Sequence, residues 1–201
     1  MRSMLICLLG YLIGAIPFAY VIGKIFFHTD VRKHGSGNLG GTNTGRVLGK
    51  KAGLAVMTLD LLKVTLVVFL SMKISDHPWA VALGSISAAV GHCYPVFVRF
   101  KGGKAVAGMY GLFFGLWVVV GYSAWVFFIP LITFLVVLRL FRVVALSSMI
   151  SAVAGVIWLY ALQSEPAICL TAVVYAVLIV LRHRENILRL LRGKEHKIHW
   201  M

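Results

Sequence analysis

Seven apolar runs, separated by short polar or charged segments, make up most of the chain. A helix needs about 20 apolar residues to cross the roughly 30 Å hydrocarbon core of a bilayer. The runs are close to that length, so the pattern predicts an all-α polytopic membrane protein with seven transmembrane helices. The whole chain, 1–201, is expected to form a single integral membrane domain. The runs lie at residues 4–23, 53–72, 78–98, 105–121, 123–138, 146–162 and 167–181.

The composition agrees with this pattern. Hydrophobic residues make up 60% of the chain and the mean hydropathy is +0.92, values that would leave a soluble domain with too much exposed apolar surface. The formal net charge is +14. A nucleic-acid-binding domain would gather such charge on one soluble face, whereas here it fills the gaps between apolar runs. Membrane lipid is therefore an expected partner, and nucleic acid is not.

The basic residues predict the orientation of the chain in the membrane. Seventeen of the twenty Lys and Arg lie in alternate connections, at 24–51, 99–104, 139–145 and after residue 181. Positively charged connections stay on the cytoplasmic side of a membrane. We therefore expect the N-terminus outside and the C-terminus in the cytoplasm, with the motifs described below facing the cytoplasm.

A glycine-rich polar stretch lies in the first of these basic connections. Glycines let backbone N–H groups approach a ligand closely, and hydroxyl, amide and guanidinium groups add donors for an oxyanion. The stretch formally matches GxGxxG, but a dinucleotide site needs a preceding strand, and here a predicted transmembrane helix precedes it. We interpret it as a phosphate cradle, with a flexible loop as the alternative. Its candidate substrate-binding residues are Gly35, Gly37, Asn38, Gly40, Thr42, Asn43 and Arg46, and Ser36 is a candidate catalytic residue.

A second basic motif follows the third apolar run. Two lysines flank two glycines directly before a predicted helix, whose N-terminus adds partial positive charge. The pattern suits a phosphate site, and the alternative is an ordinary basic turn at the membrane surface. The candidate substrate-binding residues are His92, Lys101, Gly102, Gly103 and Lys104.

A third motif closes the last apolar run. His183 and Asn186 are neighbours at i, i+3 spacing and are expected to point together into a cytoplasmic cleft as catalytic residues. The alternative is a cationic membrane anchor. Glu185 is the only acid beside several basic residues, so an ion pair is expected for it.

One pair of charges falls inside the second apolar run. Asp60 and Lys63 are three residues apart and therefore share a helix face. A charge at the middle of a span costs roughly 2.5–3.5 kcal/mol on insertion scales, and pairing offsets part of that cost. Structural pairing and direct contact of Lys63 with substrate are both open, and Lys63 is kept as a candidate substrate-binding residue.

No pattern in the chain calls for a metal or a cofactor. Cys7, Cys93 and Cys169 are isolated, and no CxxC spacing occurs. We expect no metal site and no cofactor, and three structural thiols.

Taken together, the three motifs resemble a known family, the bacterial acyl-phosphate:glycerol-3-phosphate acyltransferases called PlsY. The resemblance covers essentially the whole chain, in length, span pattern and motif order. It implies transfer of a fatty acyl group from acyl phosphate to the 1-hydroxyl of glycerol 3-phosphate. The products would be lysophosphatidic acid and phosphate, in the first acylation step of phospholipid biosynthesis. It also implies a bacterial inner-membrane enzyme with a cytoplasmic-facing site, and the soluble enzyme that makes acyl phosphate as a candidate partner.

The residues favour a mechanism without a protein base. No histidine has an aspartate five residues later, which excludes the His-x4-Asp arrangement of acyl-CoA-dependent acyltransferases. An acyl-enzyme on Ser36 would need a base that is not evident beside it. We expect direct attack by the glycerol hydroxyl, with a substrate phosphate oxygen accepting the proton. Arg46, Lys104, Ser36 and Asn186 would hold phosphates, and His183 would orient the acceptor or share in proton transfer.

One position departs from the family pattern. The family usually has a serine where Ala145 stands, and Ser147 or Ser148 are the candidates to replace it.

A transporter of a phosphate-bearing solute is the alternative function. It would share the basic loops and the charges inside a span. Transporters, however, often show internal repeats and a site at the midplane, whereas this chain has no visible repeat and its motifs gather at one interface.

Overall fold

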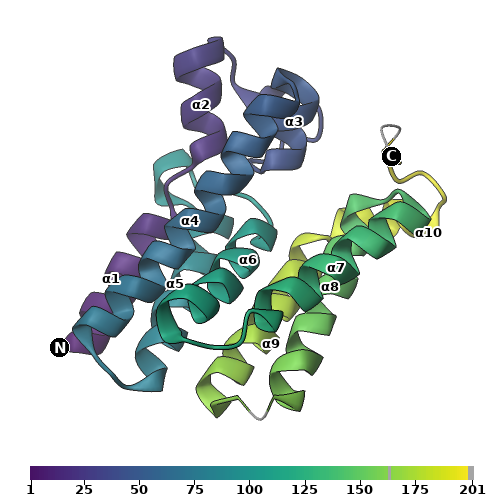
Figure 1. The fold of residues 1–201 in the computed structure, drawn as a ribbon. Helices are drawn as coiled ribbons and strands as arrows, with labels where there is room; N and C mark the ends of the chain where they lie inside the picture. The colour runs from purple at the N-terminus through teal and green to yellow at the C-terminus, as the bar shows by residue number, and fades with distance from the viewer. Residues whose placement is uncertain (163, 199–201) are drawn as a thin grey trace.

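In the computed structural model, which describes residues 1–162 and 164–198, helices follow all seven apolar runs (Figure 1). Short 3-10 turns lie at Val31–Lys33 and Val96–Val98, and α6 continues into a π-helical turn at Leu116–Val120. The all-α prediction is thus confirmed. The helices are α1 (Arg2–Gly14), α2 (Phe18–Phe27), α3 (Gly41–Leu48), α4 (Lys50–Ile74), α5 (Pro78–Cys93), α6 (Val106–Gly115), α7 (Trp125–Phe141), α8 (Val144–Ala161), α9 (Pro166–Arg182) and α10 (Arg184–Leu191).

Not every apolar helix is long enough to cross a bilayer by itself. Among the described residues, four segments are long and apolar enough, at Arg2–Phe27, Lys50–Ile74, Pro78–Val98 and Val144–Ala161. A fifth results if α9 and α10, which are bent by 58°, count as one span. The helices at Val106–Val120 and Trp125–Phe141 are apolar but shorter. The count of seven spans therefore stays a prediction, as does the orientation.

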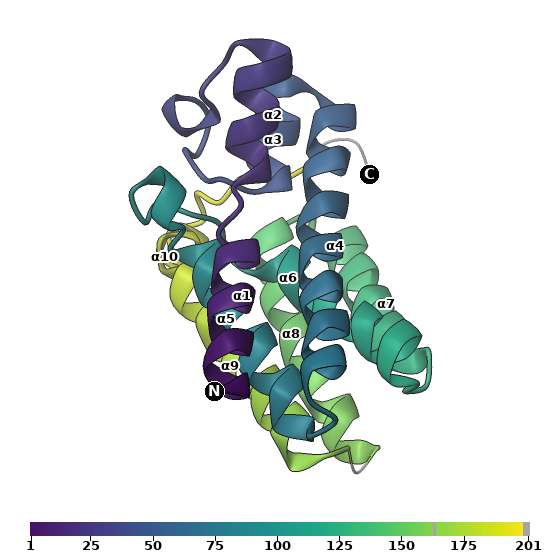
Figure 2. The ribbon, with the colours of Figure 1, turned by 90° about the vertical axis from the view of Figure 1, so that its left-hand side faces the viewer.

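The first apolar run is divided into two helices. Gly14 ends α1 and Phe18 begins α2, with Pro17 directly before the new helix. Proline lacks the N–H that would continue the hydrogen-bond ladder, so the chain changes direction at this point. As a result, α2 lies beside α3, past the end of α1 (Figure 2).

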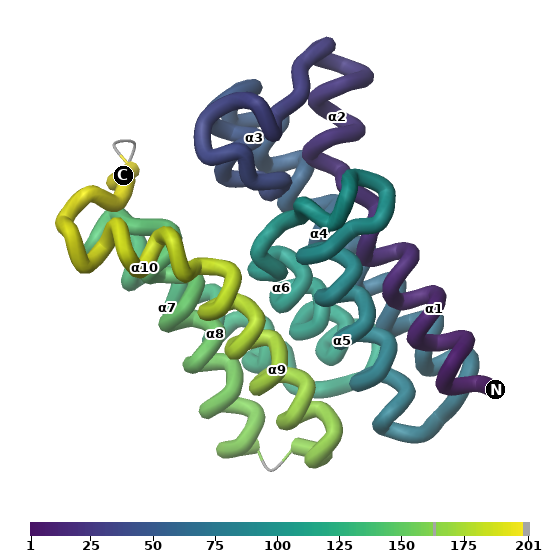
Figure 3. Tube along the Cα trace, turned by 180° about the vertical axis from the view of Figure 1, so that it is seen from behind, coloured from purple at the N-terminus to yellow at the C-terminus, as the bar shows by residue number. Residues whose placement is uncertain are grey.

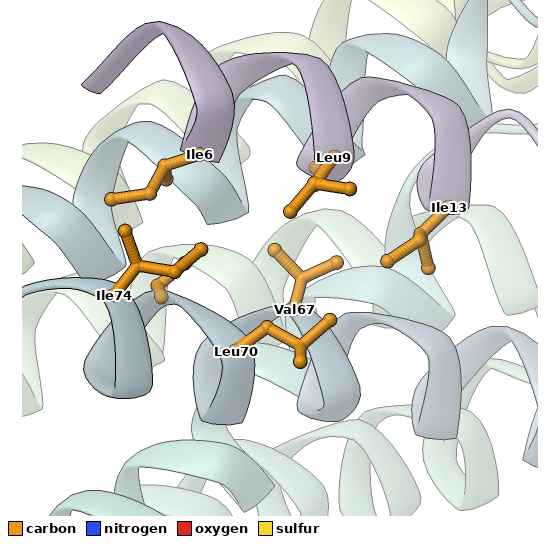
Figure 4. A pocket seen from close by; sticks show the side chains of 8 residues that line it. Ile6, Leu9, Ile13, Val67, Leu70 and Ile74 are labelled. Atoms are coloured by element: carbon orange, nitrogen blue, oxygen red, sulfur yellow. The ribbon is translucent and has the colours of Figure 1, made fainter. Parts of the chain in front are cut away.

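Small residues bring α1 and α5 into close contact. A side chain at Gly10 would collide with the backbone of Gly84, and one at Gly14 with the backbone of Ala88. In lipid the hydrophobic effect does not drive helices together, so close packing of small residues contributes more to their association. On its other side, α1 meets α4 across a shallow apolar groove lined mainly by aliphatic side chains (Figure 4).

The second half of the chain forms a separate row of helices. α7 packs on α8, and α8 on α9, as seen from behind in Figure 3. The Tyr175 hydroxyl on α9 donates to the Ser85 carbonyl at 3.0 Å and ties this row to α5. The N-terminus of α1 lies at one end of the bundle, whereas α3 and α10 lie toward the other end (Figures 1 and 2). The three sequence motifs therefore reach the same end of the molecule.

Candidate functional site

The glycine-rich loop is closed by one buried asparagine. The Ser36 N–H donates to Asn43 Oδ1 at 2.8 Å. Asn43 Nδ2 donates to the Val31 and His34 carbonyls at 3.1 and 3.2 Å. Both the oxygen and the nitrogen of the Asn43 amide thus form hydrogen bonds with backbone groups. Asn43 therefore stabilises the conformation of the loop that contains Ser36. Within the loop, Gly35 has a φ of +59°, a left-handed conformation that favours glycine.

The turn before α6 folds back on the end of α5. The Gly103 N–H donates to the His92 carbonyl at 3.0 Å, and the Gly102 N–H to the Cys93 carbonyl at 3.2 Å. A Cβ on Gly103 would collide with the His92 ring, and a Cβ on Gly102 with the His92 carbonyl. The two glycines are therefore required for close packing. Lys101 is exposed.

Arg182, at the end of α9, binds the same turn from the other side. Its Nε donates to the Gly103 carbonyl at 3.1 Å, and its Nη2 to the Gly102 carbonyl at 3.2 Å. The guanidinium carbon lies 5.0 Å from the centre of the Tyr94 ring, a cation–π contact. Arg182 thus links the third motif to the second.

His183 lies buried at the junction of α9 and α10. Its Nδ1 is 2.8 Å from the Ile179 carbonyl. Because a carbonyl only accepts, Nδ1 carries the proton, and Nε2 keeps a lone pair. Burial, and then the positive charge of Lys104, lower the pKa of His183 to about 4. The imidazole is therefore neutral at pH 7.

A second polar cluster joins three segments. Lys104 Nζ donates to Asn186 Oδ1, and Asn186 Nδ2 donates to Glu195 Oε1 at 2.6 Å. Glu195 Oε2 accepts from Arg189 Nε at 2.7 Å. Burial lowers the pKa of Lys104 to about 8, an effect that the nearby Glu195 carboxylate opposes. Among the described residues Glu195, not Glu185, forms the ion pair in this region, so the pair expected for Glu185 is wrong.

A third polar cluster is buried between α2, α4 and α5. Lys63 Nζ lies 2.6 Å from Asp60 Oδ1, 2.9 Å from the Ile16 carbonyl and 3.1 Å from His92 Nδ1. The Lys63 side chain is 3% exposed. The ammonium group forms an ion pair with Asp60 and two hydrogen bonds, to the Ile16 carbonyl and to His92 Nδ1. The structure thus shows the pairing alternative for Lys63, and a direct contact of this side chain with substrate is not supported.

One cavity of about 600 Å³ brings the three motifs together. Its polar side is lined by candidate residues from each motif. Its apolar side lies between α4, α6, α7 and α8. The predicted site residues in its lining are Gly35, Ser36, Asn38, Gly40, Thr42, Asn43, Arg46, His92, Lys104, His183 and Asn186.

Five predicted substrate-binding residues do not line this cavity. Gly37 has a φ of +69° and shapes the loop. Lys63 belongs to the buried charge cluster, Lys101 is exposed, and Gly102 and Gly103 form the turn that positions Lys104.

The position of the departure from the family pattern, at the start of α8, lies against the cavity. Ala145 and Ser148 belong to the lining, whereas Ser147 does not. The Ser148 hydroxyl donates to the Val144 carbonyl at 2.8 Å, within its own helix. Of the two candidates to replace the serine missing at Ala145, Ser148 is therefore the one that faces the cavity.

Comparison with known proteins shows the family of this chain. The family described as glycerol-3-phosphate acyltransferase matches residues 4–193. The chain belongs to this family, PlsY. The enzyme named glycerol-3-phosphate acyltransferase from Geobacillus kaustophilus is 47% identical over 197 residues, which cover 98% of this chain and 96% of the relative. The one from Staphylococcus haemolyticus is 43% identical over 209 residues, covering both chains completely.

Solved structures of the PlsY family agree with the fold. The glycerol 3-phosphate form of PlsY, an integral membrane glycerol 3-phosphate acyltransferase, superposes with a TM-score of 0.91 at 35% identity, over 99% of this chain and 96% of that one. The lysophosphatidic acid form gives a TM-score of 0.89 at 34% identity, with the same coverage. This chain is therefore an integral membrane acyltransferase of phospholipid biosynthesis.

In this PlsY family member, no local pattern assigns a contact to Arg182, Arg189 or Glu195. Arg182 belongs to the third motif and Arg189 to the basic residues after it, and nothing in their spacing shows which carbonyl or carboxylate they meet. Glu195 lies in the polar segment after α10, and only the folded chain shows that this segment lines the cavity.

The apolar side of the cavity was also missed, because its residues look like any others in an apolar run. Tyr110 on α6 is buried there, and its hydroxyl lies 2.6 Å from Ser151 Oγ on α8. The rings of Phe127 and Phe134 on α7 meet the Tyr110 ring edge-on, at 6.1 and 6.3 Å between centres. Aromatic side chains of α6 and α7, held to α8 by the Tyr110–Ser151 hydrogen bond, thus line the side of the cavity opposite α4.

Proposed function

We propose that this enzyme transfers a fatty acyl group from acyl phosphate to the 1-hydroxyl of glycerol 3-phosphate, giving lysophosphatidic acid and inorganic phosphate. One observation carries the proposal: a single cavity joins a polar side rich in cations and N–H donors to an apolar side between helices. Both substrates have a phosphate, and one has a fatty chain. The cavity offers surfaces of both kinds, side by side.

The polar side supplies donors for two phosphates. An ammonium group has three N–H donors, and in the described chain the only hydrogen-bond partner of Lys104 is Asn186. Two donors of Lys104 therefore remain for a ligand. Arg46 is exposed in the cavity lining and adds a planar guanidinium, which suits a phosphate. Ser36 and Asn38 contribute a hydroxyl and an amide from the glycine-rich loop.

The apolar side suits the acyl chain. Leu54, Met57 and Leu61 of α4 face Leu131 and Phe134 of α7 across it. Burial of methylene groups is worth about 0.8 kcal/mol each, so a long chain placed here contributes strongly to binding. This arrangement holds the acyl carbonyl at the boundary between the two sides, where the cations lie.

The chemical step follows from these placements. The 1-hydroxyl oxygen of glycerol 3-phosphate forms a bond to the acyl carbonyl carbon. The bond from that carbon to the phosphate oxygen breaks, and phosphate leaves with the electron pair. The hydroxyl proton passes to a phosphate oxygen. Lys104 and Arg46 stabilise the negative charge that develops on the leaving phosphate, and the cavity aligns the two reactants.

His183 is proposed to orient the acceptor hydroxyl. Its Nε2 lone pair can accept a hydrogen bond, because Nδ1 is held by the Ile179 carbonyl. A pKa of about 4 makes His183 a weak base at pH 7, which favours a phosphate oxygen as the final proton acceptor. Replacement of His183 by alanine tests this role. A raised KM for glycerol 3-phosphate with a modest fall in kcat is expected, whereas a collapse of kcat at unchanged KM would make His183 the base.

We further propose that the site faces the cytoplasm from a bacterial inner membrane. The three motifs and most of the Lys and Arg residues belong to the same set of connections, and positive connections stay inside. Acyl phosphate would then arrive from the cytoplasmic side, and the soluble enzyme that makes it is a proposed partner.

Purified enzyme tests the proposed reaction. Palmitoyl phosphate and palmitoyl-CoA are offered in parallel with glycerol 3-phosphate, and lysophosphatidic acid is measured by mass spectrometry. We expect product from palmitoyl phosphate alone. Product from palmitoyl-CoA alone would overturn the proposed donor. Movement of glycerol 3-phosphate into liposomes without any acyl product would support the transporter instead.

A further inference from the structure

The segment after α10 folds back onto the polar side of the cavity. Glu195, His196, Lys197 and Ile198 all belong to the cavity lining. The Ile198 N–H donates to the Arg142 carbonyl at 2.8 Å, which fastens the segment to the end of α7. The family model ends at residue 193, directly before this segment, whereas the relative from Staphylococcus haemolyticus covers the segment as well.

Glu195 makes the decisive contacts of this segment. Its side chain is 9% exposed, and its two oxygens accept from different partners, Asn186 Nδ2 at 2.6 Å and Arg189 Nε at 2.7 Å. A carboxylate can only accept. It therefore forces the NH₂ end of the Asn186 amide toward itself and turns the carbonyl end toward Lys104.

We infer that Glu195 is a positioning residue for acyl transfer, acting on substrate through Asn186 and Lys104. The inference rests on the proposed role of Lys104 in binding phosphate. Without Glu195, the Asn186 amide keeps only its contact with the Lys104 ammonium and loses the acceptor that fixes its NH₂ end. The direction in which Asn186 holds the ammonium would then no longer be fixed from both ends of the amide.

The charge of Glu195 has a second effect on Lys104. Burial disfavours the ammonium form, and a nearby carboxylate favours it. The charged groups around Lys104 are Glu195 from the C-terminal segment, Arg189 and Glu185 from α10 and Arg182 from α9. His183 also faces it, at the junction of α9 and α10. Glu195 is the largest of the contributions that keep Lys104 protonated.

The pH dependence of the Glu195→Gln variant tests the inference. Removal of the negative charge lowers the pKa of Lys104, so the alkaline limb of kcat/KM for glycerol 3-phosphate moves to lower pH, by roughly one pH unit. At pH 7 we expect a loss of roughly tenfold, mainly through KM. The matched control is Glu185→Gln. It removes the same charge from α10 but breaks no hydrogen bond to Asn186, and its limb is expected to move much less.

Glu195→Ala in the full-length chain serves as the second variant, and it decides the question if Glu195→Gln does not fold. Its alkaline limb should move as far as that of Glu195→Gln. An unmoved limb with unchanged KM in either folded variant would overturn the inference. Wild-type enzyme that makes no lysophosphatidic acid would instead overturn the proposed function, so the two failures are distinguishable.

Discussion

Lys63, which is buried, and Lys104, which is half-buried, show how this fold separates structural from chemical roles. Lys63 on α4 forms an ion pair with Asp60 and hydrogen bonds with His92 and the Ile16 carbonyl. Within the described chain, Lys104 donates one hydrogen bond, to Asn186. Both looked like substrate-binding cations in the sequence. The number of partners around each ammonium group, rather than its charge, is the reason that we propose Lys104 as the lysine that binds an anion.

The strongest test of this comparison is to remove Lys63. Lys63→Met leaves the Asp60 carboxylate buried without its ion-pair partner, which costs about 3–5 kcal/mol. We expect a large fall in the thermal unfolding temperature of the enzyme in detergent. The double variant Asp60→Leu with Lys63→Met should recover much of that loss, because no isolated charge remains. A Lys63→Met protein of normal stability but without activity would return Lys63 to the substrate site.

Removal of Lys104 should have the opposite signature. Lys104→Met takes two free donors from the cavity and should lower kcat/KM by roughly 10²–10³-fold, with little change in the unfolding temperature. Lys101→Met is the matched control, since Lys101 is exposed and lies outside the cavity lining. Equal losses in the two variants would show that general positive charge, not the position of Lys104, matters.

A smaller effect is expected at Arg182, which holds the turn before Lys104. Lysine cannot reach both the Gly102 and Gly103 carbonyls at once, so Arg182→Lys should lower kcat/KM by roughly 10–100-fold. Arg184→Lys, at an exposed position on α10, should leave kcat/KM unchanged. Steady-state kinetics that find Arg182→Lys fully active would remove the link between the second and third motifs.

The pH dependence of substrate binding sharpens the comparison further. The pKa of Lys104 is lowered to about 8, so its charge is present below pH 8 and is lost as the pH rises through that value. The KM for glycerol 3-phosphate should rise up to about tenfold between pH 8 and pH 9. Lys104→Arg keeps its charge and should flatten this rise. A profile that is unchanged in Lys104→Arg would assign the titration to another group.

The smallest effect is expected at Asp30, a carboxylate in the connection between α2 and α3 whose partner Arg32 is partly exposed. Hydrogen bonds from the Arg32 guanidinium hold the pKa of Asp30 at about 2. Its contribution to stability is present above its unfolded pKa of about 3.9 and is lost as the pH falls toward 2. Asp30→Asn should lower stability by less than about 1 kcal/mol at pH 6. Thermal unfolding of the variant and the wild type should converge near pH 2.

The apolar runs predicted the positions of the helices better than the lengths of the helices. Apolar runs must become helices in lipid, because backbone groups there need internal partners. The run that contains Pro17 nevertheless divides into α1 and α2, and the run from residue 105 ends in a π-helical turn. Hydropathy records neither the N–H group that Pro17 lacks nor the packing of a helix against its neighbours.

The candidate site was predictable where polar residues gather in loops, and not where distant segments meet. Ser36, Lys104 and Asn186 were named from their motifs and line one cavity. The spacing of Asp60 and Lys63 predicted their pairing, but His92 completes the cluster from another helix. Glu195 was missed because its value depends on a fold-back of the chain that no local pattern encodes.

Direct transfer within one cavity is the central claim, and a pre-steady-state measurement tests it most directly. Enzyme is mixed with excess palmitoyl phosphate, and released phosphate is followed before and after glycerol 3-phosphate is added. We predict no phosphate before the addition, and afterwards one phosphate for each lysophosphatidic acid. A burst of phosphate equal to the enzyme concentration, before any glycerol 3-phosphate is present, would reveal an acyl-enzyme and contradict the account.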